Sequence, residues 1–269
     1  MGMGVVRVLS VTLSHLVLAA VCALPARGEE AGGAPGTLAQ HKLNPLAYSI
    51  NLPATLSLGF GVGPRRDTQP TLSFQPWIPL GLTDDWRVVS RSNVSIIHVP
   101  GPEASTGLGD IDVSLFLTPA RAATWVWGAG PIVQFPTATD TALGTEKWSA
   151  GPTAALLYVD GPWVNGILVS HLWSVAGRSS RQDVSVTQIE MQVSYTFSND
   201  WYIQMSPTMS HDWKAPSGQR WVIPIGVDVG RTFTIGSQGI SLQIGAYYNV
   251  KKPTGAAEWV LDTQVSWLY

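Results

Sequence analysis

Residues 262–269 read DTQVSWLY, and polar and apolar side chains alternate along the whole stretch. Neighbouring side chains of a β-strand point to opposite faces, so this alternation predicts a strand. Val265, Trp267 and Tyr269 then share an apolar face, and Asp262 lies on the opposite face. The edge of a soluble sheet is usually protected by charged side chains, and this apolar face has none. We therefore expect the stretch to be one wall strand of a closed barrel.

The same alternation recurs from about residue 54 onward, in segments separated by clusters of Gly, Pro, Asn, Asp and Ser. Twelve strands are predicted, over residues 54–62, 70–79, 86–99, 108–118, 123–135, 148–159, 163–175, 184–198, 201–213, 219–234, 239–250 and 257–269. No amphipathic helix of ordinary length interrupts them. The sequence therefore predicts an all-β fold, a single transmembrane antiparallel β-barrel over residues 51–269.

The composition agrees with a membrane barrel. Charged residues make up 13% of the chain, against about a quarter in an ordinary soluble domain. Aromatic girdles mark the bilayer interfaces of such barrels. Of the 12 Trp residues, seven near predicted strand ends are expected to form these girdles: Trp86, Trp148, Trp163, Trp201, Trp221, Trp259 and Trp267. The net charge of −2 gives no basic surface for nucleic acid.

Alternate connections between the predicted strands are short, as in DGP (160–162) and ND (199–200). The connections between them are mostly longer, as in PTATDTALGTEK (136–147). Short periplasmic turns and longer extracellular loops are typical of outer-membrane barrels. An even number of strands then puts both ends of the barrel on the periplasmic side.

The N-terminal residues predict a secretory signal peptide over residues 1–28. Arg7 precedes an apolar run over 8–24, and Ala26 and Gly28 give a small-residue cleavage site. The only cysteine, Cys22, lies inside this segment, so the mature chain is expected to have no disulfide. Residues 29–50 are expected to be a linker or a plug. As a plug, the segment would cover lumen residues such as Trp77, and Lys42 would pair with an inward carboxylate such as Asp262.

Strand alternation assigns a set of polar residues to the lumen. The candidate lumen residues are Arg91, Asn93, Asp110, Asp112, Glu190, Gln192, Asp228, Gln243, Asn249, Asp262 and Gln264. Two interpretations stay open. These side chains form a satisfied network that fills a narrow twelve-strand interior, or they line a selective passage.

Five prolines fall within the predicted strands: Pro76, Pro131, Pro152, Pro207 and Pro224. Each is expected to remove a ladder hydrogen bond or to mark a bulge. The bulges would curve the wall; alternatively, they are weak points through which an apolar solute leaves sideways.

Enzyme and metal chemistry are not expected. Ser170 and His171 are adjacent in a strand and so face opposite sides, which does not fit a nucleophile and its base. No cluster of Cys, His and Asp has metal-ligand spacing. We predict no catalytic residues, no metal and no cofactor.

Four stretches carry a resemblance to a known family: GLGDIDVSLFLTPA (107–120), GAGPIVQFPTATDTALGTEKWSAGP (128–152), VSHLWSVAG (169–177) and AYYNVKKPTGAAEW (246–259). They resemble a family of bacterial outer-membrane transporters that is linked by name to the phenol meta-cleavage degradation pathway. The resemblance covers about residues 44–269. It implies a barrel that transports small, aromatic molecules, and it brings no catalytic residues.

The sequence thus favours an outer-membrane channel of a Gram-negative bacterium for small apolar or aromatic solutes. Its expected partners are outer-membrane lipids, the solute and the barrel-assembly machinery, for which Val265, Trp267 and Tyr269 look like the recognition signal. The alternatives are a structural or adhesive barrel with a plugged lumen, acting through loops 136–147 and 177–183, and a lipid-modifying barrel enzyme.

Overall fold

The computed structural model describes residues 38–121 and 123–269. The predicted signal peptide and residues 29–37 lie outside the described residues. Among those that are described, no helix is long and apolar enough to cross a membrane.

The described residues form one short helix and fifteen strand segments. They are α2 (Leu38–Leu43), β1 (Asn51–Val62), β2 (Asp67–Phe74), β3 (Trp77–Gly81), β4 (Trp86–Val99), β5 (Ser105–Leu108), β6 (Ile111–Pro119) and β7 (Trp125–Phe135). They continue with β8 (Lys147–Asp160), β9 (Trp163–Gly177), β10 (Ser185–Thr196), β11 (Trp201–Met205), β12 (Thr208–Asp212), β13 (Trp221–Ile235), β14 (Gln238–Lys251) and β15 (Trp259–Leu268).

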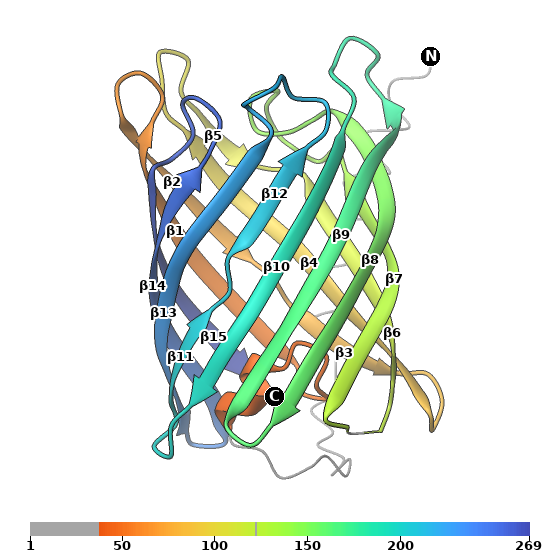
Figure 1. Ribbon diagram of the computed structural model, residues 1–269. Helices are drawn as coiled ribbons and strands as arrows, with labels where there is room; N and C mark the ends of the chain where they lie inside the picture. The colour runs from red at the N-terminus through yellow and green to blue at the C-terminus, as the bar shows by residue number, and fades with distance from the viewer. Residues whose placement is uncertain (1–37, 122) are drawn as a thin grey trace. The chain divides into compact units, whose positions relative to one another are not determined.

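The fifteen segments make a closed barrel of twelve antiparallel strands (Figure 1). Three barrel strands are interrupted and appear as the pairs β2 and β3, β5 and β6, and β11 and β12. The sheet closes because β15 pairs with β1 and β9 pairs with β10. The predicted fold class is confirmed, and the predicted strand bounds differ from the observed ones by at most three residues.

The prolines lie where the strand ladders are irregular. Pro76 and Pro207 fall in the interruptions between β2 and β3 and between β11 and β12. The register between β13 and β14 shifts at Pro224. Pro131 and Pro152 face each other as register partners on β7 and β8. On their other sides, Pro131 has no register partner on β6 and Pro152 has none on β9. The predicted loss of regular pairing is thus confirmed at all five prolines, because proline has no N–H to donate.

Apolar side chains face outward and polar ones face the lumen, as strand alternation predicts. On β14, Leu242 and Ile244 are 47% and 56% exposed, whereas the hydroxyl-bearing Ser241 is 1% exposed. On β15, Ser266 is fully buried beside the exposed Trp267. The outer surface is therefore apolar and the interior is hydrogen-bonding.

Exposed tryptophans gather at both ends of the barrel. Of the seven predicted girdle positions, six are exposed: Trp86, Trp148, Trp163, Trp201, Trp259 and Trp267. The seventh, Trp221, is half-buried because its ring packs edge-on against His211 at 4.5 Å. Two aromatic bands flanking an apolar surface fit a membrane-spanning barrel.

The two rims differ in the length of their connections. The short-turn rim carries the turn at 161–162 and the two ends of the barrel, where the Ile50 and Tyr269 backbones exchange two hydrogen bonds of 2.9 Å. The long-loop rim carries residues 136–146 and 178–184. The connection after β1, at the same rim, is a tight turn over residues 63–66, because Asp67 already pairs with Val62.

Candidate functional site

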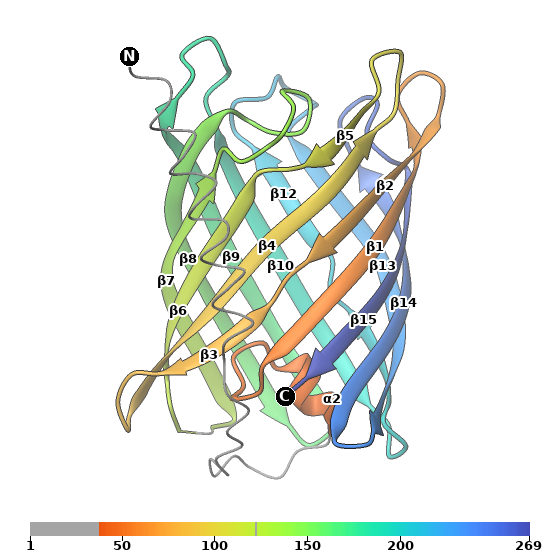
Figure 2. The same cartoon turned by 180° about the vertical axis from the view of Figure 1, so that it is seen from behind.

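Residues 38–50 lie inside the barrel at the short-turn rim (Figure 2). The helix α2 packs against β9, β10, β13 and β14. We call this stretch the inner segment.

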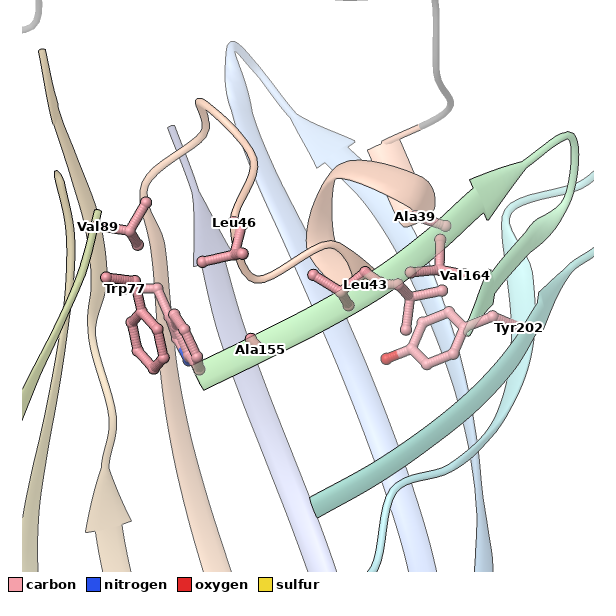
Figure 3. Close-up of a cluster of buried hydrophobic side chains, with 10 residues drawn as sticks. Ala39, Leu43, Leu46, Trp77, Val89, Ala155, Val164 and Tyr202 are labelled. Carbon is pink, nitrogen blue, oxygen red and sulfur yellow. The ribbon is translucent and has the colours of Figure 1, made fainter. Parts of the chain in front are cut away.

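Apolar side chains seat the inner segment on the wall (Figure 3). Ala39 and Leu46 are fully buried, and Leu43 is 2% exposed. They join one cluster with wall residues, namely Trp77, Val89, Phe116, Ala155, Leu157, Val164 and Tyr202. Burying one leucine side chain contributes about 1.5–3 kcal/mol, so the two leucines hold the inner segment in place. Trp77, which a plug was expected to cover, belongs to this cluster.

Wall side chains also hold the backbone of the inner segment. Gln192 donates to the Leu43 carbonyl at 2.6 Å. Arg87 donates to the Leu46 carbonyl and, at 3.2 Å, to the Ala120 carbonyl. The Arg87 guanidinium also stacks 4.0 Å from the ring centre of Tyr48. A short segment without a full helix needs such partners because its backbone groups are removed from water.

Lys42 points from α2 toward β11 and β14. Its Nζ donates to Gln243 Oε1 at 2.5 Å and lies 4.8 Å from the centre of the Tyr202 ring. The predicted pairing of Lys42 with Asp262 is wrong. Asp262 stands opposite Gly245, two positions along β14 from Gln243, so the lysine meets the amide and the ring instead.

A cavity of about 460 Å³ lies beside the inner segment. Its lining comes from one continuous part of the wall, β10–β15 followed by β1–β4, because β15 pairs with β1. Most of the lining is polar, and it includes Thr55, Ser57, Ser73, Gln75, Gln204, Ser206 and Thr208. Two aromatic side chains, Trp77 and Tyr247, also border it. The cavity is therefore a hydrogen-bonding chamber.

The structure places eight of the eleven candidate lumen residues on this cavity: Arg91, Glu190, Gln192, Asp228, Gln243, Asn249, Asp262 and Gln264. Arg91 forms an ion pair with Glu190 across the lumen, with 3.2 Å between the nitrogen and the oxygen. Asp228 accepts hydrogen bonds from the Tyr247 hydroxyl and, at 3.4 Å, from Ser206. Charged groups thus meet from strands far apart in the sequence.

The other three candidates lie outside the cavity lining. Asn93 donates to Asp112 at 3.0 Å and accepts from Gln75 at 3.2 Å, so this pair belongs to a hydrogen-bonded wall network. Asp110 lies in the interruption between β5 and β6 and binds a loop. It accepts from the Thr145 backbone at 2.7 Å and from the Thr145 hydroxyl at 2.8 Å.

The loop 136–146 is fastened at the long-loop rim. Besides the bonds to Asp110, Arg181 donates to the Gly144 carbonyl at 2.6 Å and to the Thr141 carbonyl at 3.0 Å. Leu143, within the loop, is 6% exposed. The ion pair Lys147–Asp183, at 3.0 Å, links the two long connections at this rim.

Two functional-site residues, Tyr202 and Tyr247, were not among the candidates. Strand alternation places both on inward faces, beside Gln204 and Gln243. Aromatic residues are equally typical of an interface girdle on the outer surface. The alternation along the strand was the signal that distinguishes a lumen position from a girdle position. In the structure both hydroxyls bind lumen polar groups.

Pro207 and Pro224 border the cavity where the wall pairing is incomplete. β13 pairs with β12 as far as Val222 and with β11 from Asp228 onward. Between these points residues 223–227 have no register partner on that side. The expected sideways exit at such a place stays a prediction.

Catalytic geometry is missing from the serine and histidine pair considered in the sequence. Ser170 faces inward and lies 3.5 Å from Gln188, whereas His171 bonds to Thr187 on the outer face at 2.7 Å. Among the described residues, no group of three His, Cys, Asp or Glu side chains is placed to hold a metal ion.

Solved structures include barrels of similar architecture. The barrel is similar to an outer membrane channel. That channel, from Pseudomonas putida F1, superposes with a TM-score of 0.62 at 16% identity, over 88% of this chain and 99% of its own. The NanC porin gives a TM-score of 0.53 at 11% identity, over 82% of this chain and 98% of its own. No family model matches the sequence, and a search of curated proteins finds no match either. At these identities the likeness shows the fold.

Proposed function

We propose that this chain is an outer-membrane channel whose lumen is closed at the short-turn rim by the inner segment. The observation that carries the proposal is the seating of residues 38–50 across one end of a polar, 460 Å³ cavity. Movement of that segment joins the cavity to the short-turn rim. No barrel strand has to change, because every strand begins after residue 50.

The setting proposed for the channel is the outer membrane of a Gram-negative bacterium, reached after removal of residues 1–28. The apolar outer surface and the two tryptophan bands support it. The two solved barrels above, a channel and a porin, support the same setting. The short-turn rim then faces the periplasm and the long-loop rim faces outward.

The cavity lining refines the class of solute. A purely apolar solute would leave the lining amides, hydroxyls and carboxylates without partners, which costs free energy. Small solutes that carry hydrogen-bonding groups suit this chamber better. An aromatic ring with polar substituents also fits, because Trp77 and Tyr247 offer ring faces.

Liposome swelling and single-channel recording test the proposal. The mature chain is compared with a variant that lacks residues 29–43, which removes α2 and keeps every strand. The variant is expected to admit small polar solutes faster and to show a larger conductance. Identical conductance of the two barrels would show that the inner segment does not close the channel, and would favour a structural role for the barrel.

A further inference from the structure

Lys42 is a buried ammonium group in an unusual setting. The residue is 8% exposed, yet among the described residues no carboxylate lies within ion-pair distance of it. Its partners are the Gln243 amide oxygen at 2.5 Å and the face of the Tyr202 ring at 4.8 Å. An amide oxygen and an aromatic face are groups that bind organic cations. The inner segment thus places a tethered ammonium in a cation-binding site on the wall.

The wall holds this site together by its own contacts. The Tyr202 hydroxyl bonds to Ser241 at 2.9 Å and to Gln243 at 3.0 Å. Asp228, which interacts electrostatically with Lys42, is held by Tyr247. None of these contacts belongs to residues 38–50. The polar groups of the site are therefore held by the wall, as a binding site for a free ligand requires, while the Tyr202 ring also shares the apolar cluster with Ala39 and Leu43.

The charged residues that line the cavity favour a cation at this site. Arg91 and Glu190 neutralise each other as an ion pair. Of the remaining charged lining residues, Asp228 and Asp262 are acidic and Lys42 alone is basic. The Asp262 Oδ1 atom is buried and has no hydrogen-bond partner among the described residues. When Lys42 withdraws, two carboxylates remain without a cation in a narrow lumen, where charges interact strongly.

We propose that the lumen is a site for small organic cations, in which a primary ammonium on a slender aliphatic chain replaces the Lys42 side chain. The inference rests on the proposed function and names its solute class. The ammonium group of the solute and the ammonium group of Lys42 then compete for the same partners, which are Tyr202, Gln243 and the Asp228 carboxylate. A solute shifts the closed state only by binding the open state better, and a cation meets that condition because Lys42 blocks its site in the closed state.

Single-channel recording on the full mature chain tests the competition with three probes of one size: butylammonium, butanol and butyrate. Butylammonium is expected to raise the open fraction about tenfold, within the usual range of coupling between two ligands. Butanol and butyrate are expected to leave it unchanged. An equal response to all three probes would overturn the proposal.

Substitutions test whether butylammonium acts by competing with Lys42. Lys42→Met is expected to open the channel without amine and to abolish the response to butylammonium, whereas Lys251→Met, at an exposed lysine, leaves both unchanged. In a KCl gradient, Lys42→Met is expected to prefer cations, and adding Asp228→Asn and Asp262→Asn should remove the preference. Heat-modifiable migration in gels confirms that each barrel has folded.

The outcomes separate this inference from the proposed function. A conducting channel that prefers neither ion, or prefers anions, refutes the cation site and leaves the channel standing. If the chain lacking residues 29–43 also fails to conduct, the channel itself is refuted. Tyr202→Leu gives a second test of the site, because it removes the ring without changing the lumen charge and should weaken the butylammonium response.

Discussion

The ring of Tyr202 lies on the bare backbone of Gly230. The two residues are register partners on β11 and β13. A Cβ atom at Gly230 would lie 2.2 Å from Cζ of Tyr202 and 2.3 Å from its hydroxyl oxygen. The missing side chain lets the phenol ring lie along the wall and reach Ser241 and Gln243 on the next strand. A glycine on one strand thus positions the aromatic face that Lys42 contacts.

Gly230→Ala is therefore expected to push the Tyr202 ring off the wall and loosen the inner segment. Overpacking of this kind costs about 1–3 kcal/mol of stability. Urea unfolding of the reconstituted barrel measures the cost, and single-channel recording should show more frequent opening. Gly81→Ala is the control, because no atom lies within 4 Å of a Cβ at that position. Unchanged gating in Gly230→Ala would mean that Tyr202 does not hold Lys42.

Arg87→Met removes the side chain that ties the inner segment to the wall. Arg87 is 5% exposed and donates to the carbonyls of Leu46 and Ala120. A buried acceptor left without its donor costs about 1–3 kcal/mol. The variant is expected to have a higher conductance, close to that of the chain lacking residues 29–43.

Arg231→Met is the matched control for this variant. Arg231 also stacks on an aromatic ring, 5.7 Å from the centre of Trp201, but it is exposed on the outer face. Its replacement should leave the conductance unchanged. If the two variants behave alike, Arg87 does not fasten the inner segment.

A pair of neighbours on β10 tests which face meets lipid. Ile189→Arg should destabilise the barrel by about 2–4 kcal/mol if Ile189 lies near the bilayer midplane. Gln188→Arg should be tolerated far better, because Gln188 faces the lumen beside Ser170. Folding yield into lipid vesicles and urea unfolding compare the two. Equal damage at both positions would contradict an outward Ile189 and an inward Gln188.

The strands and their facing could be predicted because a period of two is a local property of the sequence. The alternation in 239–250 and 262–269 fixes which side chains point inward whatever the rest of the chain does. Contacts across the lumen have no such local signal. Lys42 meets Gln243 and not Asp262 because of where α2 sits over β14, and the pairing of Arg91 with Glu190 joins β4 to β10.

Asp110 shows a second limit of sequence reasoning. Its inward position was predictable from the alternation, but its role depends on an interruption of the strand at Gly109 and Asp110. The Asp110 carboxylate accepts a hydrogen bond from the backbone N–H of Thr145, which lies in a loop that begins 26 residues later. Such a contact depends on the loop conformation, which no short-range pattern encodes.

Acid should release the connection between the two long loops. The Lys147 ammonium beside Asp183 lowers the pKa of that carboxyl below its ordinary value, which is about 3.9. A carboxyl whose pKa is lowered in the folded state contributes stability above its unfolded pKa, and that contribution is lost as pH falls through the folded pKa. The link is therefore expected to be intact at neutral pH and to be lost in the region below the ordinary carboxyl pKa.

Hydrogen exchange of residues 178–184 in the parent chain and in Asp183→Asn measures this link. At pH 6 the variant should exchange faster, because a neutral amide cannot form an ion pair with the buried Lys147. The difference should shrink as pH falls and vanish once Asp183 is protonated in the parent chain. Comparing two chains at each pH removes the intrinsic pH dependence of exchange. A difference that persisted unchanged into strong acid, or none at pH 6, would show that this ion pair does not hold the loops.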